Sequence, residues 1–169
     1  MQTWTQQYLQ PLLPQLTTTP CVIFLRGISG SGKSTVSKFL TEALGPSKTI
    51  ICSADNYFMK DGIYKFDITK VSEAHAYSIK CMEAALKSPE IRYIIMDNTH
   101  TRLWHLQAAE RMAQKYGSQI HYIDIIVPDA AHLEMCLDRQ RHDVPRVALR
   151  EQWANWEPNP SSICIPMFV

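Results

Sequence analysis

A glycine-rich segment constrains the fold of this chain more than any other feature. Residues 27–34 read GISGSGKS, the G-x-x-x-x-G-K-S pattern of a phosphate-binding loop (P-loop or Walker A motif). Polyphosphate oxygens need several backbone N–H groups that point into one concave nest, and glycines leave the backbone accessible. The lysine can face the β- and γ-phosphates, and the serine hydroxyl can ligate Mg²⁺. The residues predicted to bind ATP are Gly27, Ser29, Gly30, Ser31, Gly32, Lys33, Ser34 and Thr35.

The segments on both sides of this loop have the character that a P-loop requires. Residues 21–25 form a continuous apolar run, typical of a buried parallel strand. Apolar residues recur at helical spacing after the loop, and Gly45-Pro46 predicts the end of that helix. The order of strand, glycine-rich turn and helix favours a P-loop over a glycine-rich turn that contains a lysine by chance.

Short apolar strands alternate with helical patterns along most of the chain. Strands are predicted at 21–26, 48–52, 92–96 and 119–127, with a short edge strand at 163–165. Helices are predicted at 32–44, 69–87, 101–116 and 129–139, with another beginning near 143–145, and 54–68 reads as irregular. This alternation predicts an α/β domain of the three-layer P-loop NTPase fold, with helices on both faces of a parallel sheet. We expect a lead-in at 1–18, the domain at 19–156 and a packed tail at 157–169.

Composition gives weaker constraints than the loop. The 169 residues carry a net charge of +1, which gives no global signal for nucleic acid or a membrane surface. No apolar stretch approaches the ~20 residues that a membrane helix needs, and the first residues lack the pattern of a secretory signal. The five cysteines are scattered and read as buried thiols, which favours a reducing cytoplasmic or nuclear location.

Two aspartates follow predicted strands, at the sheet edge where α/β proteins bind ligands. Asp97 ends an apolar strand and is predicted to hold Mg²⁺ together with Ser34, although an aspartate here could also cap the next helix. Asp55 lies just past the second strand and is predicted to act as the base that accepts a proton from an acceptor hydroxyl. The alternative for Asp55 is a turn-forming Asp-Asn pair.

Arginines near the end of the 129–139 helix are candidates for stabilising the transferred phosphoryl group. Arg139 and Arg141 both lie there, but residues two apart point in different directions on a continuous helix, so both reach the phosphates only if the helix frays. Arg102 and Arg146 are weaker candidates, for which a solvated surface position is an equal alternative. His75 falls on a predicted apolar stripe and reads as a core histidine.

With these residues in place, the chain resembles P-loop kinases of the polynucleotide 5′-kinase-like group, which contain an AAA-type ATP-binding kinase-like domain. The resemblance covers about residues 20–150 and rests on the loop with its preceding Arg26, on Ser53-Ala54-Asp55, and on segments 61–66, 73–75, 97–99 and 139–145. It implies a five-stranded parallel sheet of adenylate-kinase type. It also implies Asp55 as general base toward a 5′-hydroxyl, Lys33 and Ser34 at the phosphates and metal, and Arg139, less specifically Arg141, as lid arginine.

The chain departs from that group beside Asp55. Kinases with nucleic-acid end-repair roles often carry an arginine shortly after the base, whereas the first cation here is Lys60. Aromatic residues interleaved with lysines in 54–68 could stack a base and hold a phosphate, or could form a hydrophobic cluster over the core.

The sequence leaves three functions open. The leading one is an ATP- and Mg²⁺-dependent kinase that phosphorylates a hydroxyl, most plausibly a nucleic-acid 5′-OH. The second is a small-metabolite kinase for a nucleoside, sugar or vitamin. The third is a nucleotide-binding interaction module with little turnover, against which an intact Asp55 argues.

Overall fold

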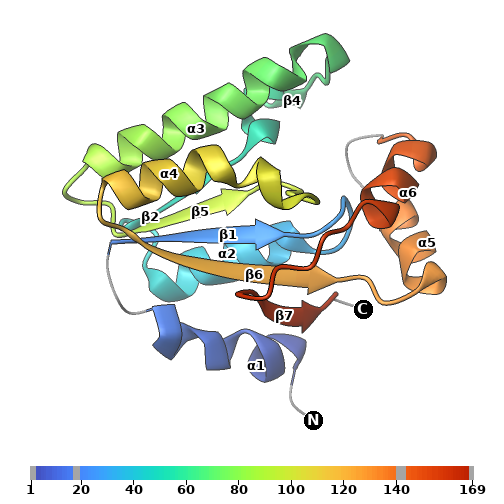
Figure 1. The fold of residues 1–169 in the computed structure, drawn as a ribbon, viewed down its shortest axis with the longest axis horizontal. Helices are drawn as coiled ribbons and strands as arrows, with labels where there is room; N and C mark the ends of the chain where they lie inside the picture. The colour runs from blue at the N-terminus through green and yellow to red at the C-terminus, as the bar shows by residue number, and fades with distance from the viewer. Residues whose placement is uncertain (1–2, 17–19, 140–143, 168–169) are drawn as a thin grey trace.

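The computed structural model describes residues 3–16, 20–139 and 144–167. Its main sheet has five parallel strands in the order β2-β5-β1-β6-β7 (Figure 1). The strands are β1 (Cys21–Arg26), β2 (Thr49–Cys52), β5 (Tyr93–Asp97), β6 (Gln119–Ile126) and β7 (Ile163–Pro166). The predicted fold class is therefore confirmed, including the short edge strand near the C-terminus.

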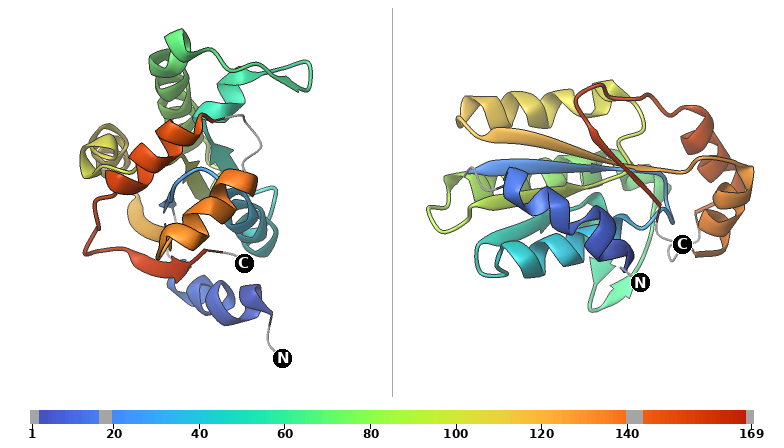
Figure 2. Two further views of the ribbon diagram at one scale, coloured as in Figure 1. Left: turned by 90° about the vertical axis from the view of Figure 1, so that its right-hand side faces the viewer. Right: turned by 90° about the horizontal axis from the view of Figure 1, so that it is seen from below.

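Helices cover both faces of this sheet and make three layers (Figures 1 and 2). On one face α2 (Lys33–Leu44) packs with α1 (Trp4–Tyr8) and the 3₁₀ segment η1 (Gln10–Leu16). On the other face lie α3 (Val71–Lys87) and α4 (Gln107–Lys115). Two further helices, α5 (Ala130–Arg139) and α6 (Arg146–Ala154), lie beyond the carboxyl ends of the strands. The loop that follows β1 is thus surrounded on several sides.

The central strand β1 leads into the glycine-rich loop and fixes the position where that loop begins. All six residues of β1 are buried, because β5 and β6 flank it and helices cover both of its faces. A strand buried in this way needs the continuous apolar run that the sequence shows. The N-terminal segment adds Leu9, Leu12 and Leu16 to the same core. The divisions at residues 19 and 156 stay a prediction.

Two predicted helices begin later than the sequence pattern indicates. The 101–116 helix is divided into the 3₁₀ turn η4 (Leu103–His105) and α4. The backbone is extended at Arg102, and Glu157 accepts hydrogen bonds from the Arg102 side chain and the Leu103 N–H. Similarly, the 69–87 helix begins at Val71, after the 3₁₀ turn η3 (Ile68–Lys70). Pro145 directly precedes α6, in agreement with the predicted helix start.

The stretch predicted as irregular contains short regular elements. It forms a 3₁₀ turn, η2 (Ala54–Phe58), and a hairpin of β3 (Met59–Lys60) and β4 (Ile63–Tyr64). Asp61 and Gly62 both have positive φ (51° and 76°), as a tight type I′ hairpin turn requires. The hairpin lies beside the N-terminal end of α3 and extends outward from the body of the domain (Figure 2).

Two predictions about burial are wrong. The buried stripe of α3 consists of Ala74, Ser78, Met82 and Ala85, so His75 falls beside it and is exposed. Not all cysteines are buried: Cys164, on edge strand β7, is exposed and Cys81 is half-buried, whereas the other three are buried. All five are free thiols. Within the described ranges, no helix is long and apolar enough to cross a membrane.

Candidate active site

The glycine-rich loop connects β1 to α2 in a conformation that only glycines allow. Gly30 and Gly32 have φ of 78° and 106°, in the left-handed region. A Cβ atom on Gly30 would lie 2.3 Å from the carbonyl oxygen of Cys136 in α5, so the loop and α5 are in backbone contact. Gly32 is the N-cap of α2 and provides no side-chain acceptor, which leaves the first N–H groups of the helix for an anion.

Lys33 and Ser31 have the properties expected in an anion site. The Lys33 Nζ donates to the carbonyls of Gly27 and Ile28 at 2.8 and 3.0 Å, within its own loop. Burial lowers the pKa of Lys33, and the carboxylates of Asp97 and Asp55 oppose that shift. The Ser31 Oγ is buried without a hydrogen-bond partner among the described residues. These features fit the phosphates of a nucleotide.

Four consecutive residues, the last of β5 and the three that follow it, hydrogen-bond to three segments around the loop. The Asp97 carboxylate accepts from Ser37 in α2 at 3.0 Å, and the Asn98 Oδ1 accepts from the backbone N–H of Ala54 at 2.9 Å. The Thr99 carbonyl accepts from the N–H of Gly27 at 3.1 Å. The His100 carbonyl accepts from the Arg26 Nε at 3.1 Å. We call Asp97–His100 the hub segment, because it fixes the loop relative to the residues around it.

Asp97 lies at the end of β5 beside the first turns of α2. Burial raises its pKa, and Lys33 is the largest influence in the opposite direction. The alternative role of Asp97 as a helix cap is not seen, because Arg102 is the N-cap of the following turn. Ser34 lies in the first turn of α2, so a hydroxyl and a carboxylate, which are hard oxygen ligands, come from neighbouring elements. This donor set fits Mg²⁺.

Asp55 lies in η2, directly after β2. Its backbone N–H is capped by the Ser53 Oγ, and its carboxylate accepts from the Tyr64 hydroxyl at 3.1 Å. Because β2 and β5 are parallel neighbours and the Ala54 N–H donates to Asn98, Asp55 and Asp97 lie at the same edge of the sheet as the loop that carries Lys33. The contacts of Asn98 and Tyr64 with this segment were not predicted, because the sequence marks 97–99 and 61–66 as segments but does not give their partners in the fold.

The candidate arginines have different surroundings. Arg139 is the exposed last residue of α5 and lies one turn after Cys136, whose carbonyl meets Gly30. Burial raises the pKa of the Cys136 thiol, and the charges of Lys33 and Arg139 oppose that shift. Arg141 lies outside the described residues. Arg102 pairs with Glu157, and Arg146 pairs with Glu134. Arg139 thus lies one turn from the point where the α5 backbone meets the loop.

Helix α6 lies across the beginning of the loop. The Gln152 Oε1 accepts from the Ser29 N–H at 2.9 Å, and the Trp153 Nε1 donates to the Val127 carbonyl at 3.0 Å. A cavity of about 250 Å³ lies between the loop and this helix, lined by Ile28, Ile125, Ile126, Val127, Trp153 and Trp156. Helix α6 therefore contributes a polar contact to the loop and, through Trp153, one apolar wall of this cavity, and its role has no signature in the sequence.

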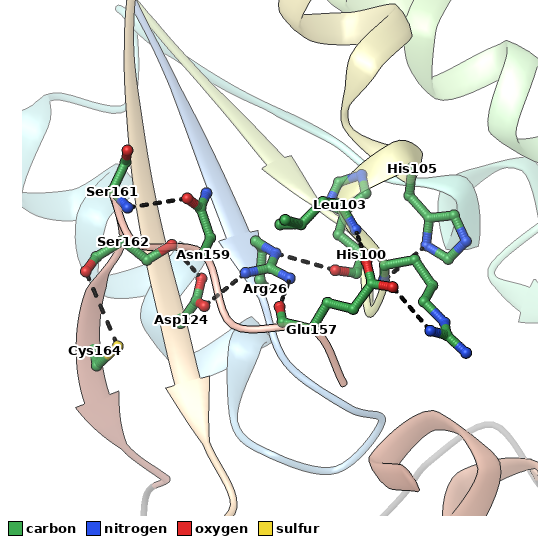
Figure 3. Close-up of polar contacts among 11 residues, drawn as sticks. Arg26, His100, Leu103, His105, Asp124, Glu157, Asn159, Ser161, Ser162 and Cys164 are labelled. Carbon is green, nitrogen blue, oxygen red and sulfur yellow. Dashed lines mark hydrogen bonds and ion pairs between the residues drawn. The ribbon is translucent and has the colours of Figure 1, made fainter. Parts of the chain in front are cut away.

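A buried arginine connects the loop to the C-terminal segment (Figure 3). Arg26 immediately precedes Gly27 and is fully buried. Its guanidinium pairs with Asp124 at 2.6 Å, donates to the carbonyl of Glu157 at 2.7 Å, and lies 4.6 Å from the ring centroid of Trp156. Burial raises the pKa of Asp124, whereas the Ser162 hydroxyl and Arg26 lower it. The segment near Glu157 thus packs directly behind the loop.

A family comparison agrees with this geometry. The model of a family described as "AAA domain" matches residues 22–159, which is most of the chain and includes the loop, Asp55, Asp97 and Arg139. The chain belongs to this family. The expected P-loop kinase-like domain is thereby confirmed. A fungal RNA kinase is among its structural neighbours, with a TM-score of 0.58 and 17% identity over 90% of this chain and 76% of that one.

Individual relatives of this AAA domain are more distant. Human NEDD4-binding protein 2 is 36% identical over 99 residues, which is 59% of this chain but 5% of that protein. The chain therefore spans a small part of that relative. A chain of the Pnkp1/Rnl/Hen1 RNA repair complex aligns with a TM-score of 0.63 and 18% identity, over 81% of this chain and 44% of that one. Chaetomium thermophilum Kti12, in complex with ADP-AlF3, aligns with a TM-score of 0.63 and 13% identity, over 86% and 88%.

The contact between the loop and α5 can be tested with two glycines of similar φ. In Gly30→Ala the new Cβ meets the Cys136 carbonyl, whereas in Gly62→Ala it meets nothing within 4 Å. Both changes cost about 1–2 kcal/mol for the left-handed backbone. We expect Gly30→Ala to lower the free energy of unfolding in urea clearly more than Gly62→Ala. Equal losses would contradict the contact.

The Arg26 network predicts a large effect from one truncation. In Arg26→Met, Asp124 is left buried without its cation, and the expected loss is about 3–5 kcal/mol in the free energy of unfolding. Adding Asp124→Leu removes the unpaired carboxylate and should restore part of the stability. Urea denaturation of the single and double variants measures both effects. An Arg26→Met loss similar to that of the exposed pair variant Lys87→Met would refute the role of the network.

Proposed function

We propose that this AAA domain transfers the γ-phosphate of ATP to a hydroxyl acceptor, with a nucleic-acid 5′-OH as the leading candidate. The observation that carries the proposal is that Lys33, Asp55 and Asp97 lie at the carboxyl edge of one parallel sheet, where hydrogen bonds join the end of β5 to α2 and to the Asp55 turn. A loop lysine and a metal-binding carboxylate serve any P-loop nucleotide site. The second carboxylate is what a transfer reaction requires, because an acceptor hydroxyl must be oriented and lose its proton.

Each residue has a defined part in the proposed transfer. The oxygen of the acceptor hydroxyl attacks the γ-phosphorus, the bond from that phosphorus to the β–γ bridging oxygen breaks, and ADP leaves. Asp55 accepts the hydroxyl proton. Lys33 and the N–H groups at the start of α2 bind the phosphate oxygens, where charge is spread during transfer. Arg139 is proposed to reach the transferred group from α5, together with or instead of Arg141.

Mg²⁺ and ATP are the proposed cofactors. Ser34 and Asp97 would hold the ion, which when bound neutralises charge on the phosphates. Within the described residues, no group of three or more His, Cys, Asp or Glu side chains could hold a metal alone. One hydroxyl and one carboxylate suit Mg²⁺, which proteins usually bind through one or two side chains plus substrate phosphates and water.

A nucleic-acid acceptor is favoured by the resemblance to polynucleotide kinases and by the likeness to a chain of an RNA repair complex. The free cysteines suit a reducing compartment such as the cytoplasm or nucleus. A small-metabolite acceptor is the second candidate, because no arginine closely follows Asp55 and the net charge is only +1. Steep salt dependence of acceptor affinity would distinguish a polynucleotide from a small metabolite.

The role of Asp55 can be tested with a matched amide substitution. Asp55→Asn keeps the shape of the side chain but cannot accept the proton, so kcat for transfer should fall by about 10²- to 10⁴-fold with little change in the KM for ATP. Asp61→Asn is the control, since it makes the same change on an exposed hairpin turn whose positive φ suits asparagine. Transfer of ³²P from γ-labelled ATP measures both. Full activity of Asp55→Asn would refute the assigned base.

A further inference from the structure

The β3–β4 hairpin is connected directly to the proposed base. The Tyr64 hydroxyl in β4 donates to the Asp55 carboxylate at 3.1 Å. The pairing continues past the strands, because the Lys65 N–H donates to the Phe58 carbonyl at 2.9 Å. The hairpin is therefore anchored beside the position where the acceptor hydroxyl must lie. The inference below rests on the proposed kinase function.

One side of this hairpin forms a half-exposed apolar surface. Met59 pairs with Tyr64 in the antiparallel register, so these side chains lie on the same face. The Phe66 ring packs on the Phe58 ring with centroids 5.1 Å apart, and the Tyr64 ring contacts that same Phe58. We call Met59, Tyr64 and Phe66 the hairpin platform.

The platform is held from beneath and open above. Phe58 is only 4% exposed and supports the rings, whereas Met59 and Phe66 are 44% and 51% exposed. The aromatic residues of this stretch thus do form a cluster, but the cluster does not bury its outer members. A packed ring loses little conformational freedom when a flat partner stacks on it, so this surface suits a planar apolar group.

Charges of both signs flank the platform. Lys60 and Lys65 are exposed and adjacent in sequence to Met59 and Tyr64, so the alternation of the strands places them on the opposite face of the hairpin. Because Asp61 and Asp67 lie on the same segment, the lysines offer local cationic contacts and not a net positive surface. Exposed aromatic rings beside lysines are the combination by which proteins bind single-stranded nucleic acid.

We propose that the hairpin platform binds the terminal nucleobase of a single-stranded nucleic-acid acceptor and so places its 5′-hydroxyl at Asp55. Phe66 is the main stacking residue, Met59 completes the apolar surface, and Lys60 and Lys65 contact backbone phosphates. Tyr64 is a positioning residue that links the bound base to the orientation of the Asp55 carboxylate. The platform takes the place of the arginine that is absent after Asp55.

The proposal can be tested by binding of two single-stranded decamers with a 5′-OH and a 3′-fluorescein. One ends in thymidine and the other in an abasic residue, so they differ only in the terminal base. Fluorescence anisotropy should show the full chain binding the thymidine end roughly 5- to 150-fold more tightly, the range of base–aromatic stacking. Phe66→Ala should lose this preference and Phe66→Trp should keep it, while both retain the wild-type circular dichroism.

Ile68→Ala is the matched control, because Ile68 is 77% exposed and lies after the hairpin, in η3. It should leave the preference unchanged. Equal affinity of the wild-type protein for both decamers, or no binding of either, overturns the platform. Labelling both decamers from ATP with equal kcat/KM would also overturn it while supporting the kinase. Base-dependent binding without labelling at any concentration would support the platform and refute the kinase function.

Discussion

The hub segment Asp97–His100 is the constraint on which the rest of the site depends. Its four residues hydrogen-bond to α2, the Asp55 turn, the first loop glycine and Arg26. These contacts fix the positions of groups from distant parts of the chain relative to one another. His100 itself has a φ of 46°, an unfavourable value for a non-glycine residue. Surrounding contacts must hold it there, and strained backbone of this kind is typical of functional sites.

The site also buries charged groups, which lowers the free energy of unfolding. Arg26 is fully buried, Lys33 has a lowered pKa, and Asp97 has a raised one, each because charge is removed from water. A raised folded-state pKa at Asp97 means that the folded protein binds this proton more tightly than the unfolded chain. The charged carboxylate therefore lowers stability above its unfolded-state pKa, and this cost is relieved as the pH falls through the folded-state pKa. A bound cation would offset the same cost.

Much of this architecture is readable from local sequence, and the remainder depends on contacts between distant residues. The strands follow from apolar runs, and Asp55 and Asp97 follow from their positions after those runs. The Asp61-Gly62 turn has a known hairpin signal, so the hairpin could have been predicted. Arg26 could not, because its partners Asp124 and Glu157 lie 98 and 131 residues away. The start of α4 depends likewise on a distant residue, Glu157. The prediction for His75 was wrong because the buried stripe of α3 lies one position away from the predicted stripe.

The central claim is that the carboxyl edge of this sheet transfers phosphate to a hydroxyl rather than only binding a nucleotide. The most direct test follows ³²P from γ-labelled ATP, with Mg²⁺, onto a single-stranded oligonucleotide that carries either a 5′-OH or a 5′-phosphate. The account predicts label at the 5′ end of the first and none on the second. ATP binding without label on the 5′-OH oligonucleotide, or on a pool of nucleosides, sugars and vitamins, would contradict it.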